Sequence, residues 1–199
     1  MFGASESVHS AAPAAGASST TADETAAAAR SGGSVGARGP ACELPVTFDI
    51  AAYWKAGAVD RPAKDSPAVE EAADSLLRQG PVTAVCEIDA KPAGNIGFLH
   101  VWTGAPDAGD ARTVLRAFVA AGGAVSKEKY RPFRAGGLEG VEVEYLSTSE
   151  ILDESKQERA LAVSTPEGPV VLHLGGLDTE EHQRMLPAHE LAGKTLRTA

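Results

Sequence analysis

The stretch from Arg159 to Arg197 constrains the fold of this chain most, because it encodes a β-hairpin that runs directly into helix. Residues 159–164 and 169–174 are two extended, mainly apolar runs. The segment Thr-Pro-Glu-Gly between them places proline and glycine where a tight turn favours them. Asp178 predicts a helix start, with Glu181 three residues later as its capping-box partner. The rest of the chain then has to cover the apolar surface of this unit.

Upstream of this stretch, apolar residues alternate with polar ones in several runs, which is the period of a half-buried strand. The expected strands are 43–50, 82–90, 96–102, 124–133 and 141–147. Apolar stripes at helical spacing predict a helix over 110–121, capped by Asp110, and a shorter one over 69–80. Residues 151–158 are polar and are expected to form a loop. Since most strands follow one another directly, the pattern favours an α+β domain whose mostly antiparallel sheet carries helices packed on it.

Residues 1–40 have a different composition. Alanine, glycine, serine and threonine make up most of this segment, and Phe2 is its only aromatic residue. Such a segment buries too little apolar surface to offset the entropy of ordering, so we expect a disordered tether. It also lacks the basic start and apolar core of a signal peptide. Residues 41–199 are then expected to form a single α+β domain of ordinary size.

The charge of the chain restricts its partners. Its 27 acidic and 18 basic residues give a net charge of −9, which is not the electrostatic footprint of a nucleic-acid-binding protein. A polybasic surface that would hold anionic lipid is missing too. The longest apolar runs are far shorter than the ~18–20 residues that cross a bilayer. We therefore expect a soluble domain with no nucleic-acid partner.

Cys42 and Cys86 are the only cysteines, and each lies in or beside an expected strand. If strands 43–50 and 82–90 are neighbours, the two can form a disulfide, provided that their Cα atoms lie ~4.4–6.8 Å apart. Such a bond would stabilise the fold by roughly 4 kcal/mol and would indicate an oxidising compartment. The alternative is a pair of free thiols that pack as small apolar side chains. The sequence leaves both open.

The histidines do not follow the spacing of a metal site. His182 and His189 are seven residues apart, but Pro187 lies between them and is expected to divide the helical segment into two. His100 and His173 lie on separate expected strands. Nothing resembles a His-Glu-x-x-His or paired Cys-x-x-Cys motif. We therefore interpret the histidines as ordinary surface or hydrogen-bonded side chains and expect no metal.

The remaining polar clusters have structural explanations. Asp178, Glu180 and Glu181 gather at an expected helix start, where acids cap free N–H groups and complement the helix dipole. The glycine-rich runs 134–140 and 174–178 lack the spacing of a phosphate-binding loop. No Gly-x-Ser-x-Gly nucleophile motif is present. We expect no cofactor and no catalytic residue.

Four aromatic residues are the candidates for a binding pocket. Trp54, Trp102, Phe133 and Tyr145 could line an apolar site for a lipid or a peptide. The alternative is that several of them are part of the core, which is the more common place for such side chains.

The order of these elements resembles the Mog1p/PsbP-like fold. The resemblance rests on the opening run ELPVTFDIAAYWKA (43–56), the helix over 110–121 and the closing hairpin and helix over 160–197. The Ala/Gly/Ser-rich start is similar to that of actinobacterial cell-envelope lipoproteins, the LpqN/LpqT group and CseA-type proteins. In those proteins a lipid-modified cysteine holds the domain outside the membrane. No lipobox is present in this chain, so membrane association would depend on an anchor that the sequence does not contain.

The resemblance implies a non-enzymatic, extracytoplasmic lipoprotein that binds a protein partner or an apolar ligand at the cell envelope. It further implies an accessory or negative regulator of envelope-stress signalling, and we expect a monomer. Two alternatives stay open. One is a hydrolase that uses a buried carboxylate with a histidine, which a cleft joining the two would favour. The other is a cytosolic chaperone or adaptor of the same fold.

Overall fold

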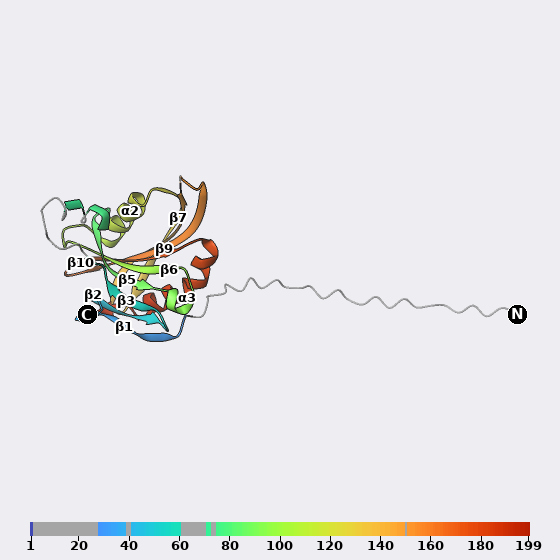
Figure 1. Ribbon diagram of the computed structural model, residues 1–199, viewed down its shortest axis with the longest axis horizontal. Coiled ribbons are helices and arrows are strands. Elements are labelled where there is room, and N and C mark those ends of the chain that lie inside the picture. Colours follow the sequence, from blue (N-terminus) through green and yellow to red (C-terminus); the bar gives the residue numbers. More distant parts are fainter. Residues whose placement is uncertain (2–27, 39–40, 61–70, 73–74, 150) are drawn as a thin grey trace.

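A computed structural model describes residues 1, 28–38, 41–60, 71–72, 75–149 and 151–199 of the chain. Within them, antiparallel strands form one large and one small sheet. Figure 1 shows helix α2 above the large sheet and the strands of the small sheet below it. The predicted α+β class, with a mostly antiparallel sheet and helices packed on it, is confirmed.

The strands and helices have the following bounds. The large sheet has, in spatial order, β3 (Lys55–Ala58), β5 (Val82–Asp89), β6 (Gly97–Gly104), β10 (Gly168–Gly176), β9 (Glu154–Thr165), β8 (Leu138–Ser149) and β7 (Ala124–Ala135), and β4 (Arg78–Gln79) also pairs with β5. The small sheet has β1 (Ser31–Arg38), β2 (Glu43–Ala51) and β11 (Arg197–Thr198). The helices described from end to end are α2 (Ala111–Ala121), α3 (Thr179–Thr195) and the short 3-10 helix η1 (Lys91–Ala93), and residues 71–72 and 75–77 are helical as well. The five strands predicted upstream and the C-terminal hairpin are thus all confirmed to within a few residues.

The large sheet separates two apolar cores. On one face, α2 buries Val114, Leu115 and Phe118 against the sheet. On the other face, α3 and β2 contribute Met185 and Phe48 to a larger core. Burying each of these larger side chains contributes roughly 1.5–3 kcal/mol, so both faces depend on a covering element.

A bulge in β5 lets one strand serve both cores. Every second residue from Val82 to Ile88 is buried, yet Val82 lies in the α2 core and Cys86 in the opposite one. The pairing with β6 shifts by one residue between Ala84 and Cys86. Because side chains alternate along a strand, that extra residue turns the later even-numbered side chains to the other face.

The predicted tether of residues 1–40 is wrong at its C-terminal end. Residues 31–38 form β1, which pairs along β2 from Ala51 to Glu43. The Ala29 N–H also bonds the carbonyl of Pro187 on α3. Composition suggested disorder because this strand holds little apolar surface, and it is ordered by backbone pairing to β2 instead. Residues 2–27 lie outside the described part of the chain, so the rest of the tether stays a prediction.

The expected division of the C-terminal helix at Pro187 is also wrong. Helix α3 runs without interruption from Thr179 to Thr195, with the proline inside it. A proline in a helix interior costs ~3 kcal/mol or more. The helix persists because the residues on either side, from His182 to Ala192, bury one continuous face on the sheet and β2.

Two further local predictions need correction. Residues 154–158, expected in a loop, extend β9, because they pair in register with the polar end of β8 and the Thr148 and Ser155 hydroxyls lie 2.7 Å apart. Of the helix predicted over 69–80, residues 69–70 and 73–74 lie outside the described residues, and residues 71–72 and 75–77 are helical as predicted. At its end, Arg78 and Gln79 form β4 rather than helix, and Leu76 is 86% exposed instead of facing a core.

Candidate binding site

Half of one face of the large sheet is not covered by any described element. Helix α2 packs at one end of this face, where Trp102 and Val171 belong to its core. Further along the same strands, side chains on this face are half-buried or exposed. We call this area the open face, made up of Lys55, Gly57, Glu87, Asp89, Ile96, Phe98, His100, His173, Gly175 and Leu177. Directly paired residues fix its register: His173 lies opposite His100, and Gly175 opposite Phe98.

The centre of the open face is apolar and aromatic. Ile96 and Leu177 are 48% and 63% exposed and are joined by a backbone hydrogen bond of 3.0 Å. The rings of Phe98 and His100 lie 5.4 Å apart, and a row of ring contacts continues from His100 to Trp102. Exposed large apolar side chains that are contiguous are characteristic of interaction surfaces.

A hollow of about 450 Å³ adjoins this centre over β3 and β5. Its floor includes Gly57, and its walls include the carboxylates of Asp60, Glu87 and Asp89 together with Lys55. A volume of this size falls within the range of ligand pockets, roughly 300–1,000 Å³. The open face therefore combines a hollow with acidic walls and an apolar strip.

A hydrogen-bonded network borders the open face on β8, β9 and β10. The Tyr145 hydroxyl donates to Glu158 at 2.9 Å, and the Nε2 of His173 lies 3.0 Å from the same carboxylate oxygen. The Lys156 ammonium lies 3.2 Å from the other oxygen of Glu158. On β5 and β6, Glu87 pairs with His100 at 3.2 Å.

The environment fixes the protonation of this network. Burial alone would raise the pKa of Glu158, but the hydrogen bond and charge of His173, with those of Lys156 and Tyr145, lower the pKa to about 2. Burial, and then the Glu158 charge, raise the pKa of Tyr145 well above its usual range. Burial, and then His173, lower the pKa of His100. Glu158 therefore stays ionised, and the Tyr145 hydroxyl stays protonated as a hydrogen-bond donor. The network holds this part of the surface rigid, and Glu158 has no proton to transfer.

A second polar cluster lies on the other face, under α3. His182 and His189 are each 1% exposed and lie on the same side of this continuous helix. The Nδ1 of His182, the Nε2 of His189 and the Nε of Arg159 are buried without a hydrogen-bond partner. Arg159 pairs with Glu190 at 2.9 Å. The expectation of surface or hydrogen-bonded histidines is therefore wrong for these two, because the uninterrupted helix carries both into the core.

A hollow of about 180 Å³ reaches this cluster from outside, between α3 and strands β7 and β8. Glu142, His189 and Glu190 line its polar side, and Phe133 and Leu161 its apolar side. Burial raises the pKa of Glu142, against the charges of Arg159 and Arg131. The Nδ1 of His189 lies 3.8 Å from Glu142, which is longer than a hydrogen bond.

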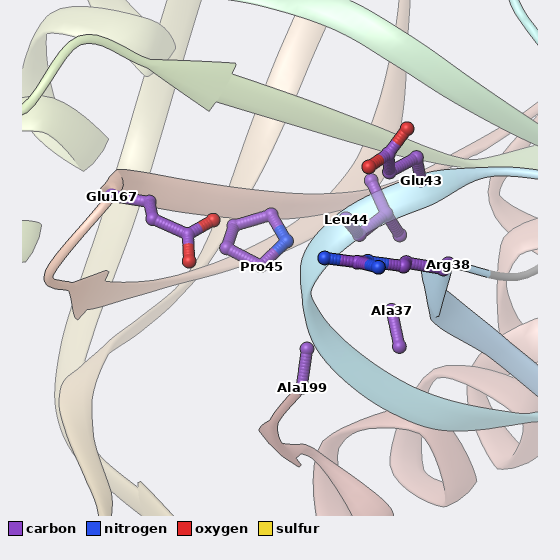
Figure 2. Close-up of a pocket in the computed structure, with 7 residues that line it drawn as sticks. All are labelled: Ala37, Arg38, Glu43, Leu44, Pro45, Glu167 and Ala199. Carbon is purple, nitrogen blue, oxygen red and sulfur yellow. The ribbon is translucent and has the colours of Figure 1, made fainter.

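A further hollow, about 660 Å³, lies where β1, β2 and the β9–β10 turn meet. Figure 2 shows Arg38 and Pro45 on its sides and Glu167 extending toward Pro45 from the turn. Its lining mixes one basic and two acidic side chains with small apolar ones. We find no convergence of aromatic or hydrogen-bonded groups among these lining residues, so size alone distinguishes this hollow.

The four aromatic residues predicted to share a pocket are divided between the two faces. Trp54 and Phe133 belong to the α3 core, whereas Trp102 and Tyr145 belong to the α2 core. Trp102 packs edge-on against Phe118 at 5.3 Å. The alternative, that these side chains are part of the core, describes them better because the sheet lies between the two pairs. Phe133 and Tyr145 each line a hollow, but these are two different ones.

Other sequence predictions agree with the geometry. Cys42 and Cys86 form a disulfide with Cα atoms 5.7 Å apart. Their strands are not neighbours, however, because β2 belongs to the small sheet and β5 to the large one. Asp178 caps α3 by accepting the Glu181 N–H at 2.8 Å, as expected. Glu181 itself is buried, where its carboxylate accepts the Ile96 N–H.

The open face was not anticipated from the sequence, although one signal existed. Ile96, Phe98, His100 and Trp102 alternate along β6 on one face, while Leu99 and Val101 on the other are fully buried. A strand that is apolar on both sides indicates coverage on both sides. Only the position of α2 in the structure reveals that one end of this face of the large sheet is left uncovered.

Two negative findings apply to the described residues. Among them, no three His, Cys, Asp or Glu side chains converge to hold a metal ion. Of the helices that the described ranges contain, none is long and apolar enough to span a membrane.

Comparisons with known proteins give a family match and several similar solved structures. A family model described as an uncharacterised lipoprotein matches residues 11–196. The solution structure of cyanobacterial PsbP (CyanoP) from Synechocystis sp. PCC 6803 aligns with a TM-score of 0.48 and 13% sequence identity, covering 78% of this chain and 87% of that one. The family match agrees with the resemblance to lipoproteins stated from the sequence. No curated protein matches this chain in sequence.

Proposed function

This chain belongs to a family of uncharacterised lipoproteins, and from that premise we propose that its domain is held at a cell-envelope membrane and acts there by binding. The occupant would be a protein partner or an apolar ligand, and the open face would be the binding site. The disulfide between Cys42 and Cys86 supports an oxidising, extracytoplasmic location. Such binding would regulate envelope-stress signalling if the partner is a protein of that signalling system.

One observation carries this proposal: contiguous apolar side chains are exposed on a rigid sheet beside a hollow of ligand size. Leu177, Ile96 and Phe98 provide the apolar part, and the hollow over Gly57 provides the depth. The network around Glu158 holds the neighbouring strands in register. A preorganised surface of this kind loses little entropy when it binds.

The test is a photo-reactive amino acid placed at Leu177 in the full chain and expressed in its own cells. We expect a discrete cross-linked product in the membrane fraction, because Leu177 lies on the open face and is 63% exposed. The matched control places the same group at Glu128, an exposed position on the edge strand β7. Equal labelling from both positions, or no product from Leu177, would contradict the proposed binding site.

A second candidate function, hydrolysis, is favoured by the hollow of about 180 Å³ that contains Glu142 and His189. A buried carboxyl group with a raised pKa is suited to general acid catalysis. Against it, the histidine lies 3.8 Å from the carboxylate, and neither cysteine is available as a nucleophile because both are in the disulfide.

We therefore expect no difference between the chain and its Glu142→Gln variant when both are assayed against ester, amide and glycoside substrates. The measurement is the rate above the uncatalysed background at pH 5 to 7. Turnover that falls by a factor of roughly 100 or more in the variant, as loss of a general acid produces, would replace binding by hydrolysis as the leading function.

A further inference from the structure

We propose that the open face binds an extended peptide segment in which basic residues alternate with large apolar ones, an inference that rests on the binding function proposed above. Its basic side chains would face Glu87 and Asp89, and an apolar side chain would occupy the space above Gly175. The partner would thus be a protein with an exposed cationic and apolar segment.

The charge of the open face selects a cationic partner. Asp60, Glu87 and Asp89 all line the hollow over β3 and β5, where Lys55 is the one basic side chain among the described lining residues. The nearest cation on the opposite flank, Lys156, is already bound to Glu158 at 3.2 Å and to the Gly176 carbonyl at 2.8 Å. The net negative field that remains attracts Lys or Arg and repels the headgroups of anionic lipids.

Two glycines leave space for side chains of the partner. A Cβ atom added at Gly57 would have no heavy atom within 4 Å, and one added at Gly175 would meet only the His173 ring, at 3.5 Å. Gly97 on the neighbouring strand β6 differs: an added Cβ there would collide with Met185 and with the Gly175 carbonyl oxygen. The space above Gly57 and Gly175 therefore belongs to the surface and is not filled by packing.

The spacing of these features fits an extended chain. Glu87 and Asp89 lie on β5, and Gly175 lies on β10, with only β6 between the two strands. Two inter-strand spacings amount to about 9.6 Å. An extended peptide advances about 3.3 Å per residue, so side chains two positions apart, which share a face, start about 6.6 Å from one another, and the long flexible stem of a Lys spans the remaining distance. Phe98, between them on β6 and opposite both Asp89 and Gly175, offers an aromatic ring to a passing apolar or cationic group.

The experiment measures the Kd of the full chain for a labelled peptide of three Lys-Ser-Phe-Ser repeats by fluorescence anisotropy. Two control peptides replace every Lys by Glu or every Phe by Ser. We expect binding of the first peptide, weakening by about tenfold or more with either control, and further weakening as salt rises from 50 to 500 mM, because exposed charge pairs are screened.

Variants of the protein separate the binding site from the fold. Gly175→Val fills the space above β10, and the combined Glu87→Gln and Asp89→Asn change removes the acidic wall; each is expected to weaken binding about tenfold. Glu128→Gln, which removes an acid from the exposed edge strand β7, is the matched charge control and should leave Kd unchanged. Thermal melts check that the variants stay folded, as the open surroundings of Gly175 lead us to expect.

Three results would overturn this inference: no binding of the Lys-Phe peptide, equal binding of the Glu-Phe peptide, or Kd values that Gly175→Val leaves unchanged in a folded protein. Binding to vesicles of anionic phospholipid that Gly175→Val weakens would likewise replace a peptide by a membrane surface as the occupant. If the peptides fail while Leu177 still gives its cross-linked product, the class of partner is wrong and the binding function stands. If Leu177 also gives none, both fall.

Discussion

Replacing Cys42 and Cys86 together by serine is expected to lower the free energy of unfolding by about 4 kcal/mol. The disulfide joins residues 44 apart in sequence, and restricting an unfolded chain over a loop of that length removes conformational entropy of about this size. It is also the covalent link between two separate sheets, because Cys42 precedes β2 and Cys86 lies within β5. Both side chains are buried, at 3% and 0% exposure.

Thermal unfolding with and without reductant measures this effect. At roughly 2–4 °C per kcal/mol for a domain of this size, the melting temperature should fall by about 8–16 °C on reduction. The double serine variant should melt at the reduced temperature and ignore reductant, which separates loss of the disulfide from any other action of the thiol reagent. A reduced protein that melts within about 2 °C of the oxidised one would show that the two sheets hold together without the bond.

Strands and helices whose pattern is local were predictable from the sequence. Leu44, Val46 and Phe48 alternate along β2 and are buried as predicted, and Asp110 caps α2 through the Thr113 N–H at 2.8 Å. In both cases side-chain period or capping chemistry depends on residues a few positions apart. Such signals do not require knowledge of the tertiary fold.

Features that depend on distant partners were not predictable. The strand Ser31–Arg38 is ordered by its pairing with β2, which its glycine-rich composition does not suggest. The continuity of α3 through Pro187 depends on the face that the helix buries. In each case tertiary contacts outweighed a local preference, as single-residue propensities allow.

The binding site shows the same division more sharply. His100 and His173 were each recognised as strand residues, but their position directly opposite one another follows only from the register of β6 and β10. The acidic hollow requires Glu87 on β5 to lie beside Gly57 on β3, two residues that are 30 positions apart in the sequence. Sheet order, which no residue pattern encodes, is what assembles the site.

Acid is expected to unfold the domain over a range that the two buried histidines set. Burial, and then the charge of Arg159, lower the pKa of His182 to about 4 and that of His189 to about 3. The folded state thus favours neutral imidazole, and its stability is fully present above the ordinary pKa of about 6.5. As the pH falls below that value, the unfolded chain gains protons that the folded one does not accept, and stability is lost progressively down to the folded pKa values.

The magnitude follows from the shifts. Between pH 7 and pH 4.5 each histidine should remove roughly 2 kcal/mol from the free energy of unfolding. The carboxylates that face the cluster, Glu142 and Glu144 on β8 and Glu190 on α3, pair with Arg159 and so do not provide a counter-ion reserved for either imidazole. Glu158, whose pKa is about 2 in the folded protein, adds a further loss only below its ordinary value of about 4.5, so it acts later in the same direction.

Urea unfolding at pH 7, 5.5 and 4.5 tests this account. The His182→Gln and His189→Gln double variant removes both titrating groups, so its stability should stay nearly level over this range even if it starts lower at pH 7. The test therefore compares how steeply the free energy of unfolding changes with pH. A general weakening of packing would lower the stability at every pH and leave that slope unchanged. His100→Gln is the comparison: the pKa of His100 is lowered too, but this side chain is partly exposed, so its removal should flatten the slope less than removal of the two buried histidines. If the free energy of unfolding of the double variant falls with pH as steeply as that of the parent chain, the buried histidines do not govern acid stability.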